Sequence, residues 1–198
     1  VLPEDYKPFN IVEVRFKGSK KLFYKNVKGL ELFTGDYVIV DSDIGYDVGQ
    51  ISLAGELVKL HLKKYGVEED NAEMRNIQSI ANESEIKKYQ EYKDKEQKTL
   101  EEARTIALQL RLKMKISDIE FQGDGKKVTF YYTSEGRVDF RELIRRYASS
   151  FKSRIQMLQV SYREEASRLG GIGSCGRELC CSTWLTDYKV VSMSAPKI

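Results

Sequence analysis

Residues 82–114 read NESEIKKYQEYKDKEQKTLEEARTIALQLRLKM, and this stretch separates two regions made of short β-type runs. Asn82 followed by Glu85 is typical of a capping box at the start of a helix. Apolar residues recur every three or four positions at both ends of the stretch, whereas its middle is charged. A helix of about 30 residues spans about 45 Å. We therefore predict one long helix over 82–115, with its middle in solvent, that either links two domains or docks a partner as an arm.

Residues 1–81, before the helix, contain short runs of strand-forming residues separated by turn residues. The runs are residues 11–16, 21–24, 37–40, 47–53 and 57–62. Five or six short strands at this spacing indicate a small β-barrel or a strongly twisted sheet. We predict a barrel-like domain that binds either protein or nucleic acid. His61, the only histidine, falls in the last run, and we expect an ordinary surface or core residue there.

Residues 116–198, after the helix, alternate between strand and helix patterns. Two apolar runs, 116–121 and 128–133, flank a Gly-Asp-Gly turn that is typical of a hairpin. Asp139 is placed to cap a helix, with a glutamate three residues later, and a further strand-like run covers 155–162. This order predicts a ββαβ unit with a right-handed crossover. The predicted fold class is therefore α+β, with a barrel-like N-terminal domain, a long bridging helix and a ββαβ domain that carries a cysteine-rich loop.

The loop at residues 170–181, with the sequence GGIGSCGRELCC, contains all three cysteines within seven positions. Thiolates are soft ligands, and they gather when they coordinate zinc or an iron-sulfur cluster. Glycine permits unusual backbone angles, so nearby glycine N–H groups can hydrogen-bond the sulfur atoms and tune such a site. The candidate residues are the ligands Cys175, Cys180 and Cys181 and the backbone positions Gly171, Gly173 and Gly176. The alternative is that one cysteine packs in the core while Cys175 is a simple thiol.

The composition indicates a protein of the cytoplasm. The chain has 198 residues, of which 41% are hydrophobic, so it can bury the core of one large or two small domains. Three cysteines gathered in one loop do not form the even, dispersed set of a secreted disulfide framework. No apolar run approaches the roughly 20 residues of a membrane span, and charged residues stand where a signal peptide would have its apolar core. The start at valine suggests that further residues precede it.

Positive charge is concentrated in the second half of the chain. The overall formal charge is only +3, but the segment from Arg137 to Glu178 contains nine basic and five acidic residues. Eight of the nine are arginine, whose planar guanidinium pairs well with phosphate or carboxylate. The segment is either an ordinary solvated helix face or a surface for a partner or nucleic acid. The candidate binding residues are Arg141, Arg145, Arg146, Arg154 and Arg177.

The cysteine loop and its surroundings resemble the bacterial RicT (YaaT) family, which shares its conserved region with a yeast polymerase-suppressor protein. The run GGIGSCGRELCCSTWL at 170–185 is similar to the hallmark of that family. Four further segments are similar to the family at corresponding positions. They are VEVRFK at 12–17, GDYVIV at 35–40, GRVDFREL at 136–143 and REEA at 163–166. The resemblance therefore covers most of the chain.

The resemblance implies a non-catalytic regulatory subunit. Members of the family assemble with two small helical proteins, RicA and RicF, into a complex that carries 4Fe-4S clusters. That complex resembles a specificity factor for the endoribonuclease RNase Y, and it promotes the maturation of selected messenger RNAs. By resemblance, Cys175, Cys180 and Cys181 are cluster ligands. The expected partners are small helical proteins and an endoribonuclease, with RNA as a further candidate and no membrane span.

The family pattern also contains a second cysteine group, Cys-Gly-x-x-x-Cys-Cys, beyond the first, and this chain reaches Ile198 without it. We therefore expect a truncated C-terminus. A closed four-ligand site would need a ligand from elsewhere in the full protein or from a partner, so the cluster is expected to be shared. Zinc is the alternative to iron-sulfur, although zinc sites usually use C-x2-C pairs rather than C-x4-C-C.

Catalysis is not expected from this sequence. A nucleophilic hydrolase needs a histidine base, and His61 has no evident partner. No glycine-rich phosphate loop follows a strand either. The main hypothesis is thus a cytoplasmic regulatory subunit, and the rival is an RNA- or DNA-binding or scaffold module with an arginine-rich face and a structural zinc site or no metal. An adaptor for replication or secretion machinery is a third alternative.

Overall fold

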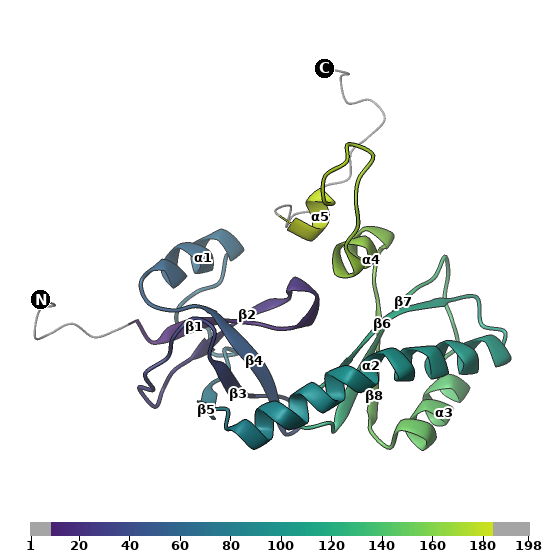
Figure 1. The fold of residues 1–198 in the computed structure, drawn as a ribbon, viewed down its shortest axis with the longest axis horizontal. Coiled ribbons are helices and arrows are strands. Elements are labelled where there is room, and N and C mark those ends of the chain that lie inside the picture. The colour runs from purple at the N-terminus through teal and green to yellow at the C-terminus, as the bar shows by residue number, and fades with distance from the viewer. Residues whose placement is uncertain (1–8, 184–198) are drawn as a thin grey trace, which may run out of the picture.

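The structure is a computed structural model that describes residues 9–183. Two units that each contain a β-sheet lie side by side and are spanned by one long helix (Figure 1). The fold is α+β, as predicted from the sequence. Trp184 and Leu185 of the resemblance, and the predicted domain ends at residues 1 and 198, lie outside the described residues.

The N-terminal unit is a five-stranded sheet in which every neighbouring pair is antiparallel. Its strand order is β2-β1-β4-β3-β5. The strands are β1 (Ile11–Arg15), β2 (Lys21–Lys25), β3 (Tyr37–Asp41), β4 (Tyr46–Leu53) and β5 (Ile77–Ile80). An isolated bridge between Lys25 and Asn76 brings the end of one edge strand beside the start of the other. The sheet is therefore barrel-like, but the strands of residues 9–183 do not close into a barrel.

The predicted strand at 57–62 is wrong, because these residues belong to the helix α1 (Leu57–Tyr65). Val58 and Leu62, four positions apart, are buried on the same face of this helix and pack with Ile11 of β1. Such spacing buries one face of a helix, whereas a strand would alternate. The helix ends at Gly66, which has the positive φ of 65° common at helix C-termini.

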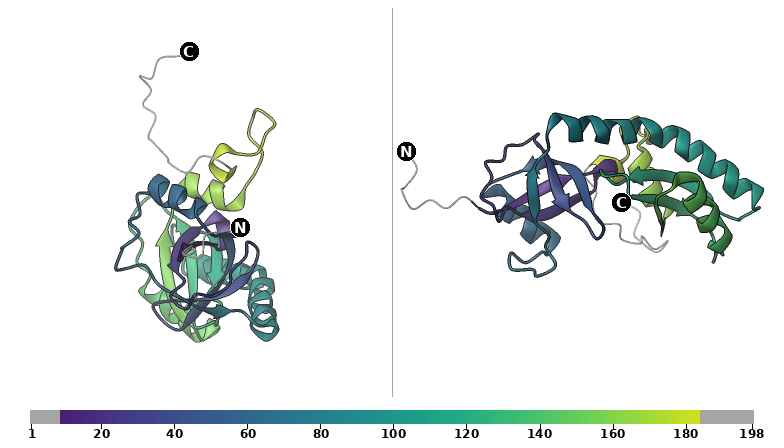
Figure 2. Two further views of the ribbon diagram at one scale, coloured as in Figure 1. Left: turned by 90° about the vertical axis from the view of Figure 1, so that its left-hand side faces the viewer. Right: turned by 90° about the horizontal axis from the view of Figure 1, so that it is seen from below.

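The long helix α2 (Glu83–Gln109) begins with the predicted capping box. The amide of Glu85 donates to the Asn82 side chain, and the amide of Asn82 donates to the Glu85 carboxylate, both at 2.9 Å. The helix runs along both units (Figure 2). Tyr89 in its first half contacts the ring of Tyr37 of β3, and one face of its C-terminal half packs on the second sheet through Leu100 and Ala103 among others, so α2 bridges the two units.

The C-terminal unit is the predicted ββαβ arrangement. The strands β6 (Lys115–Phe121) and β7 (Lys127–Thr133) are antiparallel, and β8 (Arg154–Gln159) lies parallel to β7 after the helix α3 (Arg141–Phe151). Residues from α2 and α3 pack on one face of this sheet, where the Tyr147 hydroxyl donates to the carbonyl of Ala103 at 2.7 Å. This bond fixes α3 against α2 in the core.

Two boundaries in this unit differ from the prediction. The N-cap of α3 is Phe140 rather than Asp139, whose carboxylate instead accepts the amide of Arg141 at 3.1 Å. The last strand ends at Gln159 because Ser161 caps a new helix, α4 (Tyr162–Leu169), in a capping box with Glu164. The short helix α5 (Cys180–Thr183) follows the cysteine loop. None of the helices within residues 9–183 combines the length and the apolarity that crossing a membrane would need.

Candidate functional site

The cysteine loop is a small hairpin between α4 and α5. Ile172 and Glu178 form an isolated antiparallel bridge. The amide of Gly173 donates to the carbonyl of Arg177 at 2.7 Å, and the amide of Leu179 donates to Gly171 at 3.0 Å. The hairpin therefore presents the 174–176 turn at its tip, while α5 begins at its base.

The glycines of the loop do not all have the same role. Gly171 and Gly176 have φ values of 151° and 79°. Residues with a side chain rarely adopt such angles, so the hairpin requires glycine at both positions. Gly173 has no such angle, and a Cβ at this position would lie at an ordinary contact distance of 3.5 Å from the Cys175 sulfur. Only the first two are thus explained by backbone conformation.

The three thiols lie at two places in the loop. Cys175 occupies the hairpin tip and is exposed, and Cys180, also exposed, begins α5 beside the half-buried Cys181. Among residues 9–183, no three His, Cys, Asp or Glu side chains are close enough together to hold a metal ion. The donor chemistry suits zinc or an iron-sulfur cluster. A complete site would need the thiols to converge and a further ligand from beyond these residues.

The predicted arginines do not share one surface. Arg141 pairs with Asp139 at 2.7 Å, and Arg145 and Arg146 both pair with Glu142 of the same helix, at 3.0 and 3.5 Å. These pairs are mostly solvent-exposed and locally offset the positive charge of α3. Arg154 is exposed at the start of β8, whereas Arg177 lies in the cysteine loop at the other end of this unit (Figure 1).

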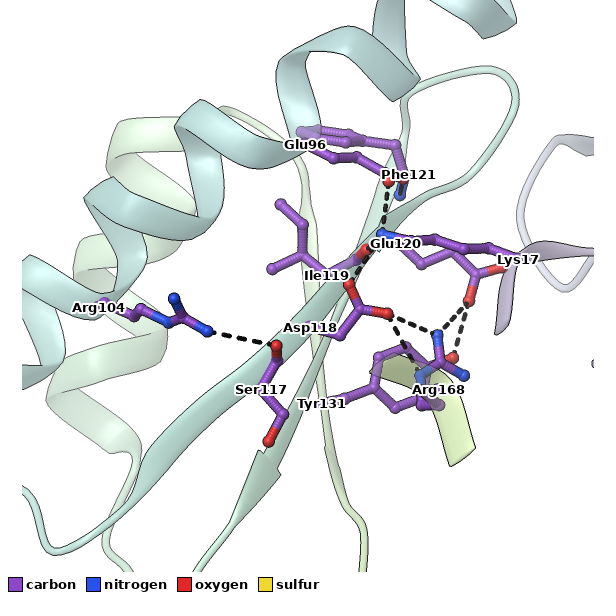
Figure 3. A network of polar contacts seen from close by, with 10 residues as sticks. All are labelled: Lys17, Glu96, Arg104, Ser117, Asp118, Ile119, Glu120, Phe121, Tyr131 and Arg168. Carbon is purple, nitrogen blue, oxygen red and sulfur yellow. Dashed lines mark hydrogen bonds and ion pairs between the residues drawn. The ribbon is translucent and has the colours of Figure 1, made fainter. Parts of the chain in front are cut away.

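The helix α4, which leads into the cysteine loop, is anchored by two side chains on its inner face. Glu165 accepts a hydrogen bond from the Ser117 hydroxyl at 2.8 Å and pairs with Lys115 at the same distance. Arg168 pairs with Asp118 at 3.0 Å, and its guanidinium lies 3.6 Å from the centre of the Tyr131 ring (Figure 3). Arg168 belongs to the basic segment of the sequence that was considered as a binding surface, but its side chain is only 10% exposed.

A β-bulge in β6 explains how neighbouring residues of this strand contact both α2 and α4. The pairing register with β7 shifts between Ile116 and Asp118. Ile116 and Ile119 both enter the core beneath α2, while Ser117 and Asp118 contact α4 instead. Arg104 of α2 donates to the carbonyls of Ile116 and Ser117, which satisfies the backbone at the bulge. Bulges commonly redirect side chains in this way next to functional sites.

The N-terminal unit meets this region through the 3-10 turn η1 (Lys17–Ser19), between β1 and β2. The Lys17 ammonium donates to Glu96 of α2 at 2.6 Å, to Asp118 at 2.8 Å and to the carbonyl of Ile119 at 2.7 Å. Glu96 lies in the middle of α2, where the sequence predicted a solvated stretch, but its side chain is 12% exposed. We call the joined residues the interdomain cluster: Lys17, Glu96, Asp118, Glu120, Tyr131 and Arg168.

Within the interdomain cluster, opposite charges compensate in part for the cost of burying ionised groups. Burial raises the pKa of Glu96, and the neighbouring Lys17 only partly reverses the effect. Burial would lower the pKa of Lys17, but its hydrogen bonds to Asp118 and Glu96 outweigh that cost and raise it. Arg168 is also 3.7 Å from Glu120, which accepts a hydrogen bond from the Tyr131 hydroxyl. Removing one partner from such a cluster leaves an uncompensated buried charge.

A second contact between the units lies at the turn after β6. The amide of Gly123 donates to the Asp47 carboxylate at 2.8 Å, and the Gln122 side chain donates to the carbonyl of Tyr46 at 3.1 Å. A Cβ at Gly123 would lie 2.6 Å from the backbone nitrogen of Val48, so this approach requires glycine. Burial raises the pKa of Asp47 to about 6 despite its backbone hydrogen bonds.

His61 has a partner that sequence analysis missed. Its Nδ1 is 2.6 Å from a carboxylate oxygen of the fully buried Glu13, whose other oxygen accepts the Ser52 hydroxyl at 2.5 Å. Burial alone would raise the pKa of Glu13, but its bonds with Ser52, His61 and Lys21 together lower it. The carboxylate lies between serine and histidine, so the imidazole is not hydrogen-bonded to the hydroxyl as a nucleophile-base pair requires.

Comparison with known proteins shows the family of the chain. Residues 75–160 match the profile of the PSP1 C-terminal conserved region. The stage 0 sporulation protein YaaT of Bacillus subtilis (strain 168) is 36% identical over 189 residues, which cover 96% of this chain and 66% of that protein. The chain thus belongs to the family of YaaT and PSP1, and it spans just under two thirds of the length of this bacterial relative.

Two fungal proteins share smaller parts of their length with the chain. An uncharacterised protein of Schizosaccharomyces pombe is 35% identical over 179 residues, covering 78% of this chain and 24% of that protein. Protein PSP1 of Saccharomyces cerevisiae is 46% identical over 50 residues, covering 25% of this chain and 6% of that protein. No solved structure matches the chain.

Proposed function

We propose that this protein is a non-catalytic regulatory subunit of a bacterial, cytoplasmic complex. It binds an iron-sulfur cluster through the cysteine loop and modulates RNA maturation by an endoribonuclease of the RNase Y type. The proposal draws on family membership, on the name of the Bacillus relative, a sporulation protein, and on the resemblance of the whole loop to the RicT hallmark. The observation that carries it is the exposure of two thiols, Cys175 and Cys180, on a hairpin that follows a helix anchored to β6.

The arrangement of the thiols supports a shared cluster rather than a self-contained site. Cys175 and Cys180 are exposed, and within residues 9–183 no third suitable side chain completes a site with them. Iron-sulfur clusters use four protein ligands, so at least one must come from another part of the full protein or from a partner. Small helical partners of the RicA and RicF kind are the proposed source.

The bound cluster would supply a redox-sensitive connection between subunits. The residues of this chain would hold it with Cys175, Cys180 and Cys181, while Gly171 and Gly176 give the hairpin its shape. The anchored helix α4 would keep the loop in a defined orientation toward the partner. None of these roles requires a catalytic residue, and the Glu13 arrangement offers no nucleophile-base pair.

The functional test compares two variants of the full-length protein in a cell that contains the endoribonuclease and the helical partners. Changing Cys180 and Cys181 to serine should prevent copurification of the partners and leave the selected messenger RNAs unprocessed. The matched control reverses charge at Arg141 and Arg145, which lie on α3 away from the loop. Loss of RNA processing only in the arginine variant, with steep salt dependence of RNA binding, would instead favour the nucleic-acid-binding hypothesis.

A further inference from the structure

The helix α4 is held at its inner face and at its C-terminal end by different parts of the molecule. Its inner face is bound to β6 through Glu165 and Arg168. Near its end, the Ser167 hydroxyl donates to the backbone carbonyl of Cys181 in α5. We propose that α4 couples the two sites, so that metal binding at the cysteine loop strengthens the docking of the Lys17–Ser19 turn on the C-terminal unit. The coupling rests on the proposed function in that the loop must bind a metal.

The first step connects the loop to the helix. α4 ends at Gly170, whose amide donates to Ala166, and the chain then turns through two glycines with φ values of 73° and 151°. Only Leu169 and Gly170 separate Arg168 from the hairpin, and the Ser167 hydroxyl binds the carbonyl of Cys181, which follows the hairpin. A ligand that draws Cys180 and Cys181 toward Cys175 therefore acts on the last turn of α4.

The second step connects the helix to the other unit through a shared carboxylate. One oxygen of Asp118 accepts two hydrogen bonds from Arg168, at 3.0 and 3.3 Å, and the other accepts Lys17 at 2.8 Å. A shift of Arg168 thus changes the position and the electrostatic environment of the carboxylate that binds Lys17 (Figure 3). The Arg168 guanidinium also lies against the Lys17–Ser19 turn, since a Cβ added at Gly18 would be 3.0 Å from Cζ of Arg168.

The coupling requires that the turn can leave the docked position seen here, and that the loop changes how firmly it is docked. Energetic coupling between two sites is reciprocal, so a turn that is docked more firmly by metal must in return hold the metal more firmly. Arg168 is a positioning residue in this scheme, because it touches neither the thiols nor the bound metal. Coupling free energies between protein sites commonly correspond to factors of about 5 to 150.

Hydrogen exchange can follow both ends of α4 in the same sample. The amides of Gly173 and Leu179 report on the loop, and those of Phe16 and Lys20 report on the turn. The sample is the full-length protein copurified with its helical partners, stripped of metal with a chelator and then compared before and after addition of Zn²⁺. We expect Zn²⁺ to slow exchange in the loop and, by at least about fivefold, in the turn.

Three variants separate coupling from binding. Arg168→Gln should keep protection of the loop by Zn²⁺ but lose protection of the turn. Ser167→Ala should do the same, and because it removes only one hydroxyl it serves where Arg168→Gln fails to fold. Arg137→Gln, which changes an exposed arginine outside the candidate binding residues, should behave as the wild type.

The outcomes distinguish the coupling from the proposed function. If Zn²⁺ protects the loop of the wild type but leaves the turn unchanged, the coupling is wrong and metal binding stands. If Zn²⁺ protects neither, the loop does not bind zinc, and iron and sulfide analysis of the anaerobic complex decides the proposed function separately. The coupling is then judged on the metal-free protein, where Arg168→Gln must speed exchange at Gly173 and Leu179, and unchanged exchange there would overturn it.

Discussion

Only Leu169 separates Arg168 of the interdomain cluster from the cysteine loop in the sequence, yet the polar groups of the cluster and the thiols of the loop differ in where their partners lie. In the cluster, Lys17, Glu96, Asp118 and Arg168 find all their partners inside the chain, and no buried side-chain nitrogen or oxygen among residues 9–183 lacks one. In the loop, Cys175 and Cys180 face solvent. The first region fixes a geometry, and the second offers ligands to something outside this part of the chain.

Removal of the shared carboxylate should have the largest effect on stability. Asp118→Ala leaves the buried Arg168 and the partly exposed Lys17 without their common carboxylate, and breaking a buried ion pair costs about 3–5 kcal/mol. Urea unfolding, followed by far-ultraviolet circular dichroism, measures the loss of unfolding free energy. The control is Asp139→Ala, which removes an exposed carboxylate and its hydrogen bond with the Arg141 amide, and should therefore cost only about 1 kcal/mol. Equal midpoints for the two variants would show that the cluster contributes no stability.

The second contact between the units should respond to pH through Asp47. Burial raises its pKa from 3.8 to about 6, so the folded protein binds a proton more tightly than the unfolded chain. Stability therefore falls as pH rises through this range, by at most about 3 kcal/mol for a shift of this size. Relative to Asp47→Asn, the wild type should gain stability as pH falls from 7.5 to 4. A constant difference in unfolding free energy across that range would contradict the assignment.

A smaller loss is expected where the β6–β7 turn approaches β4. Gly123→Ala places a Cβ 2.6 Å from the backbone nitrogen of Val48, and overpacking of this kind costs about 1–3 kcal/mol. Gly136→Ala is the matched control, because a Cβ there meets nothing within 4 Å. The midpoints of thermal unfolding of both variants are compared with that of the wild type. An unchanged midpoint for the Gly123 variant would mean that the two units do not approach so closely.

The smallest effect on folding should come from the thiols. Cys175→Ser and Cys180→Ser change exposed side chains, so the unfolding free energy of the metal-free chain should stay within about 0.5 kcal/mol of the wild type. Chemical denaturation of the chelator-treated protein tests this. A large loss in either variant would place that cysteine in the core and support its interpretation as a structural residue.

The sequence predicted features whose causes are local. The capping box of Asn82 and Glu85 and the glycine-rich hairpin with its three cysteines depend on residues that are close together along the chain. The segment 57–62 was assigned incorrectly because a short apolar run fits both a strand and a helix. Only the contact of Val58 and Leu62 with Ile11 decides in favour of the helix.

The interdomain cluster could not be predicted, because it joins residues from five elements, η1, α2, β6, β7 and α4. Lys17 and Asp118 are brought together by the β6 bulge, for which the sequence has no clear local signal. One available signal was the spacing of Glu165 and Arg168, three positions apart, which places an acid and a base on the same face of α4. The capping box at Ser161 and Glu164 fixes where that helix starts, and together these patterns could have indicated a buried inner face.

The central claim is that the cysteine loop holds an iron-sulfur cluster with help from a partner, and metal analysis tests it most directly. Iron, acid-labile sulfide and zinc would be measured in the full-length protein purified without oxygen, alone and with the helical partners, alongside its visible absorption. We predict iron and sulfide in the complex and their loss when Cys175, Cys180 and Cys181 are all changed to serine. Zinc or no metal in every preparation, or a serine variant that keeps its iron and sulfide, would contradict the claim.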